Sequence, residues 1–168
     1  MRNYTTILFL LLSITSYTQN DFELVVWMLK CSEGFRAKNY NCTANKSTIG
    51  YGTQSKQATI TKKEAQKRLY QHFEKDYQIV KKNYPTLVKR QHLILAALMY
   101  NSGKVGKELD YRIKNGLPVA DIWIQYSTVR GQTAKYLIKR RAIELDIWNG
   151  VNLNYYYNYY KECVCNQK

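Results

Sequence analysis

Residues that break helices or loosen a chain are scarce in this sequence of 168 residues, which holds 2 prolines and 8 glycines. That scarcity excludes a collagen-like or linker-rich chain. The sequence also lacks an apolar run of the roughly 20 residues that a membrane-spanning helix needs. It does contain 45% apolar and 14% aromatic residues. This is enough to offset the entropy cost of folding, so a wholly disordered chain is excluded as well.

Acidic residues are also in short supply. The sequence has 12 of them against 26 lysines and arginines, which gives a net charge of +14 and a pI near 9.6. Such a protein attracts polyanions, namely nucleic acid, an anionic membrane or the anionic wall of a bacterium. Charge alone does not choose among these three partners.

The N-terminus has the pattern of a secretory signal peptide. Arg2 supplies a basic start, residues 5–14 are apolar, and a polar segment follows at once. We place the signal at 1–18 and the mature domain at 19–168, and therefore expect an exported protein, periplasmic or secreted. Two alternatives stay open: a first core helix, and a signal anchor that is later released from the membrane.

Four cysteines fit an exported protein, because disulfides persist in oxidising compartments. Three full pairings are possible, and a bond between Cys163 and Cys165, which are only two residues apart, is disfavoured. The chain has only two histidines, His72 and His92, and neither lies near those cysteines. We therefore expect no zinc or other metal site, and no signature supports a cysteine–histidine hydrolase.

Apolar spacing predicts a small N-terminal lobe followed by a long helix. Residues 21–31 show helical spacing, and residues 48–53 alternate β-branched or aromatic residues with glycine, which is typical of a short strand or hairpin. Thr61 and Glu64 form a capping-box pattern. The apolar stripe that follows predicts a helix over 62–82, which ends before the next proline.

The second half of the sequence is predicted to be helical. A helix over 87–100 contains the almost wholly apolar segment 92–100, which should be buried on all sides. Shorter helices are predicted over 107–115, 119–126 and 134–148.

Together these elements predict an α+β fold. It consists of a small N-terminal lobe with a β hairpin, a long connecting helix, a helical C-terminal lobe and a tyrosine-rich tail. Their approximate ranges are 21–60, 62–82, 86–150 and 151–168. A cleft between two such lobes is a natural binding site.

Glu33 is the best candidate for acid chemistry among the few acidic residues of the N-terminal half. It lies at a predicted helix end, before a glycine and beside aromatic residues. A carboxyl group placed there is partly desolvated, which suits a general acid. A solvated glutamate at the end of a helix is the alternative that the sequence leaves open.

The segment from Glu33 to Arg36 (EGFR), Tyr40, and the segment Thr48–Gly52 (TIGYG) resemble, in order and spacing, the phage-type lysozymes or endolysins. This is the glycoside hydrolase family of the T-even phage lysozyme. The similarity continues through the capped helix, Tyr100-Asn101-Ser102-Gly103, and the segment from Tyr136 to Glu144, and it covers about residues 22–148.

The resemblance implies a lysozyme-like fold and hydrolysis of the β-1,4 bond between N-acetylmuramic acid and N-acetylglucosamine in bacterial peptidoglycan. It implies no cofactor. It also makes the anionic wall the best explanation of the positive charge, so we expect no nucleic-acid partner, and we expect a monomer.

The family's catalytic pattern is a glutamate, an aspartate or sometimes a cysteine nine residues later, and a threonine six further on. On this sequence it falls on Glu33, Cys42 and Thr48. The more common aspartate is thus replaced by a thiol. The resemblance implies that Glu33 is the general acid and that Cys42, as a thiolate, and Thr48 place the attacking water. A structural disulfide at Cys42 stays open, as does a peptidoglycan-binding relative that has lost catalysis.

The family's fold also implies that the C-terminus returns to the first helix. A bond from Cys31 to Cys163 or Cys165 is therefore expected. Arg140 or Arg141 is expected to reach Glu33, with solvated cations as the alternative.

Asn101 is expected either to contact the sugar or to cap its own helix. We count it, together with Arg140 and Arg141, among the candidate substrate-binding residues.

Overall fold

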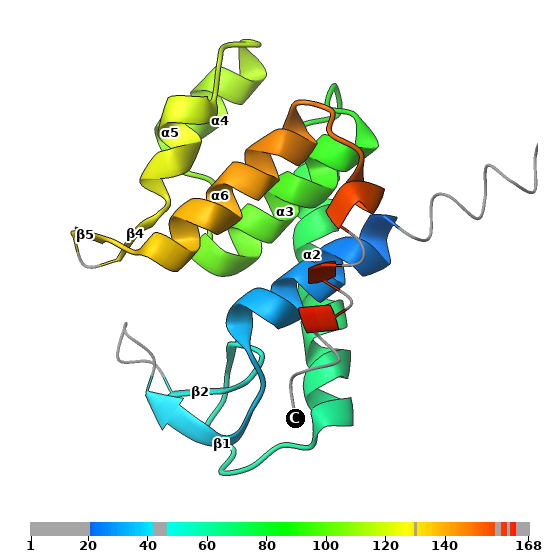
Figure 1. Cartoon of the computed structure of the whole chain (residues 1–168), viewed down its shortest axis with the longest axis vertical. Helices are drawn as coiled ribbons and strands as arrows, with labels where there is room; N and C mark the ends of the chain where they lie inside the picture. The colour runs from blue at the N-terminus through cyan, green and yellow to red at the C-terminus, as the bar shows by residue number, and fades with distance from the viewer. Residues whose placement is uncertain (1–20, 42–46, 130, 157–158, 161, 164–168) are drawn as a thin grey trace, which may run out of the picture.

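The computed structural model describes residues 21–41, 47–129, 131–156, 159–160 and 162–163. The predicted signal segment, Cys42 and Cys165 lie outside these residues. Within them the chain forms a small antiparallel sheet and a larger group of helices, joined by one long helix (Figure 1). This confirms the predicted α+β, lysozyme-like fold class.

The elements follow the order that the apolar spacing predicts. A first helix occupies the described residues 21–33. It is followed by β1 (Arg36–Asn41), β2 (Ser47–Gly50), β3 (Thr53–Gln54), α2 (Lys62–Asn83), α3 (Lys89–Ser102), α4 (Lys107–Lys114), α5 (Ala120–Gln125), β4 (Thr128–Val129), β5 (Gln132–Thr133), α6 (Lys135–Trp148) and the 3₁₀ helix η1 (Leu153–Tyr156).

The small sheet has the strand order β1-β2-β3, with both pairs antiparallel. It packs closely on α2 at Gly50, where a Cβ atom would lie 2.8 Å from the Cβ of Ala65. Gly50 also has φ +67°, a conformation that glycine adopts without strain. The sheet therefore approaches the connecting helix at a position that tolerates no side chain.

The long helix α2 begins where the capping pattern places it. The hydroxyl oxygen of Thr61 accepts a hydrogen bond from the backbone N–H of Glu64 (3.2 Å). The carboxylate of Glu64 is bound one turn later by Arg68 (3.0 Å). The buried side of the helix carries Ala65, Leu69, Phe73, Asp76 and Val80.

Helix α3 lies at the centre of the molecule, packed against α2 and α6. The segment 92–98 and Tyr100 are buried, in agreement with the apolar run in the sequence. The helix starts two residues later than predicted and also ends two residues later. It continues to Ser102, whose hydroxyl donates to the carbonyl of Leu98 (2.8 Å), and stops at Gly103 with φ +79°.

Three of the described elements were not predicted: the strands β4 and β5, which form a second hairpin, and η1. Each strand of that hairpin has only two residues, which is too short for an alternating pattern to be recognised. Among the described residues, no helix is both long enough and apolar enough to cross a membrane.

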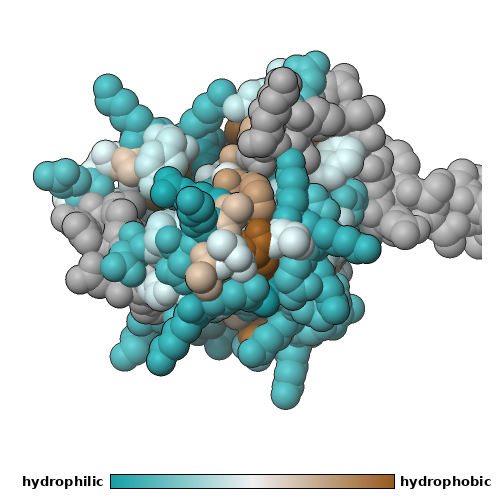
Figure 2. Space-filling view, turned by 90° about the horizontal axis from the view of Figure 1, so that it is seen from below, coloured by the Kyte–Doolittle hydropathy of each residue, from teal (hydrophilic) through white to brown (hydrophobic). Residues whose placement is uncertain are grey.

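The surface is mostly hydrophilic on the side of the sheet lobe. Figure 2, which views the molecule from below, shows a small central group of hydrophobic residues surrounded by hydrophilic ones.

Candidate active site

Glu33 is the last residue of the first helix. Gly34 ends that helix with φ +66°, and its N–H donates to the carbonyl of Lys30 (3.1 Å). Such a left-handed residue after a helix is the usual way to close its last turn. The turn leaves the Glu33 side chain 20% exposed, at a point that residues from α3, α6 and the sheet lobe also reach.

Two side chains of the helical lobe hold the Glu33 carboxylate. The Arg140 guanidinium donates from Nη1 to Oε1 of Glu33 (2.9 Å), and Asn101 donates from Nδ2 to the same oxygen (3.3 Å). Asn101 lies near the end of α3 and Arg140 in the first half of α6. Of the two predicted arginines, Arg140 is thus the one bonded to Glu33.

Arg141 belongs to the same group of contacts but does not bond Glu33. It is fully buried and donates from Nη2 to Oδ1 of Asn101 (2.6 Å). Asn101 therefore acts neither as a simple helix cap nor as an isolated polar residue. It bridges Arg141 to Glu33.

The turn after β2 approaches Glu33 from the other side. A Cβ atom on Gly52, which has φ +84°, would lie 3.3 Å from Oε2 of Glu33. The neighbouring Tyr51 accepts a hydrogen bond at its carbonyl from the Tyr100 hydroxyl (2.7 Å). Burial raises the pKa of Tyr100, and the charge of Glu33 raises it further. Tyr100 therefore stays neutral and keeps the sheet lobe fixed to α3 beside the carboxylate.

Thr48 lies in β2, paired with Tyr40 of β1 and Gln54 of β3. Its side chain is buried, at 3% exposure. Cys42 lies outside the described residues, but it follows Asn41 directly in the chain.

A disulfide joins Cys31 to Cys163, with the two Cα atoms 5.8 Å apart. It connects the C-terminal tail to the first helix two residues before Glu33. Among the described residues, no group of three or more histidine, cysteine or carboxylate side chains is placed to hold a metal ion.

Glu144 is a residue of this site that the sequence reasoning missed as a functional position. It is fully buried and binds both Arg140 and Arg141. Glu144 follows Arg141 by three residues and Arg140 by four, and this spacing along a helix indicates possible ion pairs. That signal is weak, because the same spacing is common on exposed helix faces.

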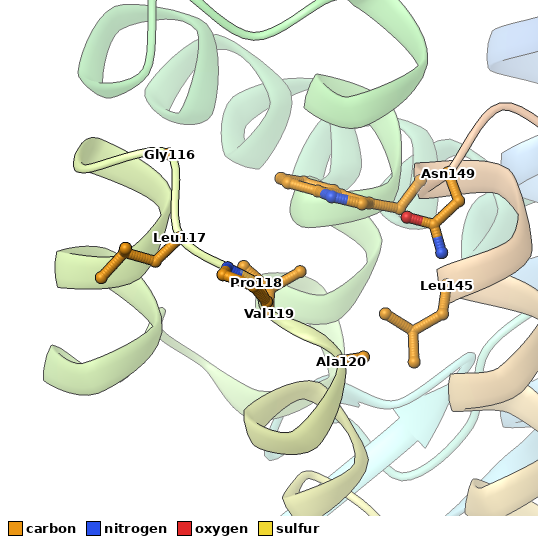
Figure 3. Close-up of a pocket in the computed structure, with 8 residues that line it drawn as sticks. Gly116, Leu117, Pro118, Val119, Ala120, Leu145 and Asn149 are labelled. Atoms are coloured by element: carbon orange, nitrogen blue, oxygen red, sulfur yellow. The ribbon is translucent and has the colours of Figure 1, made fainter.

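A pocket of about 280 Å³ lies elsewhere, between the α4–α5 connection and the end of α6 (Figure 3). Its lining runs from Gly116 to Ala120 and includes Leu145, Trp148 and Asn149, so it contains no charged side chain. This pocket therefore offers no side-chain acid or base for catalysis.

Comparison with known proteins gives a family match. The family model described as phage lysozyme matches residues 30–144, a span that includes Glu33, Cys42, Thr48 and Glu144. No curated protein matches the chain.

Solved structures with the same fold are similar over most of their length. An endolysin from Escherichia coli O157:H7 phage FAHEc1 is 25% identical with a TM-score of 0.61, covering 76% of this chain and 91% of its own. The muramidase domain of SpmX from Asticaccaulis excentricus has 23% identity, a TM-score of 0.60, and coverage of 77% and 94%. The active form of P1 phage endolysin Lyz has 16% identity, a TM-score of 0.61, and coverage of 83% and 93%.

A small sheet and a helical lobe that meet at a helix-end glutamate define a lysozyme-type hydrolase, and the structural neighbours agree. More specifically, the family match spans well over half of the sequence, and the chain belongs to the phage lysozyme family. Its general activity is therefore the hydrolysis of peptidoglycan.

Proposed function

We propose that the protein cleaves the β-1,4 bond between N-acetylmuramic acid and N-acetylglucosamine, with Glu33 as the general acid. The observation that carries this proposal is the position of Glu33. It is a partly buried carboxyl group at the junction of the two lobes, held by Arg140 and Asn101 and lying inside the matched family span. A carboxyl group in such a setting has a fixed direction and restricted access to water.

In the reaction, Glu33 gives its proton to the bridging oxygen as the bond from that oxygen to the anomeric carbon breaks. A water molecule adds to the anomeric carbon and loses a proton. Cys42, as a thiolate, orients this water or takes the proton, and Thr48 holds the water by a hydrogen bond. A free thiol has an ordinary pKa of about 8.5, so the positive charge of the protein favours the thiolate that this role needs.

The location and the assembly follow from the same proposal. We infer export through the signal at 1–18, because the substrate lies outside the cytoplasmic membrane, and action as a monomer. The net charge of +14 supports attraction to the anionic wall, and that attraction should weaken as salt is added.

The test is the release of reducing ends from purified peptidoglycan by the mature protein and by Glu33→Gln. General acid catalysis contributes about 100- to 10,000-fold to a rate, so the variant should lose at least about 100-fold. Glu108→Gln is the matched control, since its side chain is 58% exposed on α4 and it should keep full activity. Equal release by wild type and Glu33→Gln would contradict the assignment of Glu33.

A second pair of variants tests the thiol. Cys42→Asp should remain active with an altered pH profile, because it restores a carboxylate, whereas Cys42→Ala should lose activity. If the wild type releases nothing in oxidising and reducing buffer while Cys42→Asp does, the protein binds peptidoglycan without cleaving it.

A further inference from the structure

Glu144 is an acidic side chain that the proposed reaction does not use, although it is wholly buried. Both of its oxygens are occupied. Oε1 accepts from Nε of Arg140 (2.9 Å), and Oε2 accepts from Nε1 of Trp123 (2.9 Å) and from Nη1 of Arg141. These donors come from α6 and α5, so Glu144 joins the two helices at the back of the site.

The two arginines connect Glu144 to Glu33 by hydrogen bonds. Arg140 reaches Glu33 with Nη1 and the carbonyl of Ala97 with Nη2 (3.3 Å). Arg141 reaches Asn101, which in turn reaches Glu33. Glu144 and Glu33 are therefore connected by two routes, and the four hydrogen-bonded partners form a closed ring with Glu33.

The ring determines which way the Asn101 amide points. A guanidinium group only donates hydrogen bonds, so the atom of Asn101 that faces Arg141 has to be the oxygen. The amide N–H then faces Glu33. Because Glu144 holds Arg141 in place, it also decides, through Arg141, that Asn101 presents a donor to the carboxyl group.

The ring also balances charge. It contains two guanidinium groups and, when Glu33 is ionised, two carboxylates. Glu144 shares Arg140 with Glu33 and pairs with Arg141, so neither guanidinium group is left as an unpaired buried charge.

Two further titratable groups face the ring, Tyr100 beside Glu33 and Tyr160 beside Glu144. Burial raises the pKa of both phenols, so both are neutral in the pH range of activity. From α2, Asp76 acts on the Tyr100 phenol and the His72 ring contacts it. The charged groups that are hydrogen-bonded within the ring are Glu33, Glu144 and the two arginines.

We propose that Glu144 is a positioning residue for the reaction. It holds Arg140 and Arg141, and through them it keeps the Arg140 guanidinium and the Asn101 amide directed at Glu33. This inference rests on the proposed function of Glu33 but assigns a role to a residue that never touches the substrate.

The test compares the pH–rate profiles of Glu144→Gln, Arg141→Gln and the double variant. Glu144→Gln leaves a surplus positive charge and should move the basic limb of the profile to lower pH by about one unit, with a fall in kcat of roughly 10- to 100-fold and little change in KM. Arg141→Gln should move the limb to higher pH. The double variant removes one charge of each sign and should bring the limb back towards the wild-type position.

Two variants separate positioning from stability. Glu144→Asp keeps the charge and should keep the basic limb in place. Ile147→Ala makes a cavity at a fully buried residue of the same helix and should lower the Tm without moving the limb. If Glu144→Gln does not fold, the comparison of Arg141→Gln, whose limb moves to higher pH, with the double variant, whose limb returns towards the wild-type position, still decides the question.

An independent readout is the NMR signal of the Arg140 Nε–H. It should exchange slowly with solvent in the wild type and in Glu33→Gln, and quickly in Glu144→Gln. If the wild type is inactive but shows this exchange pattern, the proposed catalytic function is contradicted. The positioning of Arg140 by Glu144 is then still supported. An active enzyme whose basic limb stays in place in all three charge variants would overturn the inference, as would fast Arg140 exchange in the wild type.

Discussion

Gly52 is the residue that brings the sheet lobe closest to Glu33. Its φ of +84° disfavours any side chain, and an added Cβ would lie 3.3 Å from the Glu33 carboxylate. We expect Gly52→Ala to lower the stability by about 1 kcal/mol and the rate of peptidoglycan hydrolysis by roughly tenfold or more, because the carboxyl group has to move.

The matched control is Gly116→Ala. Gly116 has a similar φ of +64°, with no atom within 4 Å of the added carbon. Thermal unfolding should show a comparable loss for both variants, while only Gly52→Ala loses activity. Equal activity of the two variants would show that the contact with Glu33 is unimportant.

Asp76 is a buried acid on α2 whose Oδ2 has no hydrogen-bond partner among the described residues. Burial raises its pKa, an effect that His72 and Lys75 only partly oppose. A raised pKa in the folded state means that stability is lost as the pH rises through the acidic range. Asp76→Asn should therefore have a higher Tm than the wild type at pH 7 and the same Tm at pH 3.

Asp110 is a comparison case, because its pKa is shifted in the opposite direction from that of Asp76. Its pKa is lowered, chiefly by a hydrogen bond from the Tyr84 hydroxyl (2.7 Å). A lowered pKa contributes stability above the unfolded-state pKa, and that contribution is lost as the pH falls. Asp110→Asn should therefore lower the Tm at pH 7 and leave it unchanged at low pH. Shifts of the same sign in both variants would contradict the burial argument for Asp76.

At the scale of elements, α2 depends on the cap at its N-terminus. The Thr61 hydroxyl satisfies the N–H of Glu64, and replacing such a cap by alanine costs about 1 kcal/mol. Thr61→Ala should therefore unfold at a lower urea concentration than the wild type. Thr86→Ala, in the exposed turn between α2 and α3, is the control and should unfold like the wild type.

Helix α6 shows how one element can serve both core and site. Arg140, Arg141 and Glu144 are all buried in it, together with apolar residues such as Leu137 and Ile147. Its buried residues therefore do not form an apolar stripe, and periodicity alone predicts the helix but not which charged residues face inward.

At the scale of the whole molecule, the disulfide between Cys31 and Cys163 spans a sequence separation of 132 residues. Closing a loop of that size is worth about 5 kcal/mol in the chain-entropy model, and losing such a bond typically costs about 2 to 5 kcal/mol. Cys31→Ser should therefore lower the Tm by on the order of 10 °C.

Cys163→Ser should have the same effect, and the double variant should lose no more than either single one, because all three lack one bond. A reducing agent should lower the Tm of the wild type towards that of the variants. Additive losses in the double variant would show that the two cysteines contribute separately.

The sequence by itself determined the parts of the protein that rest on local signals. The cap at Thr61, the apolar run in α3 and the position of Glu33 at a helix end all follow from residues close together in the chain, where hydrogen bonding and side-chain spacing act directly. The family resemblance and the fold class followed from the same short segments.

Only the tertiary structure decided how the acid is held. Adjacent arginines on a helix point in different directions, so the packing of α6 against α3 selects Arg140 for Glu33 and Arg141 for Asn101. Glu144 gains its role because that packing buries it between the two arginines. Long-range contacts of this kind depend on how the helices pack against one another. Short-range sequence patterns do not determine that packing.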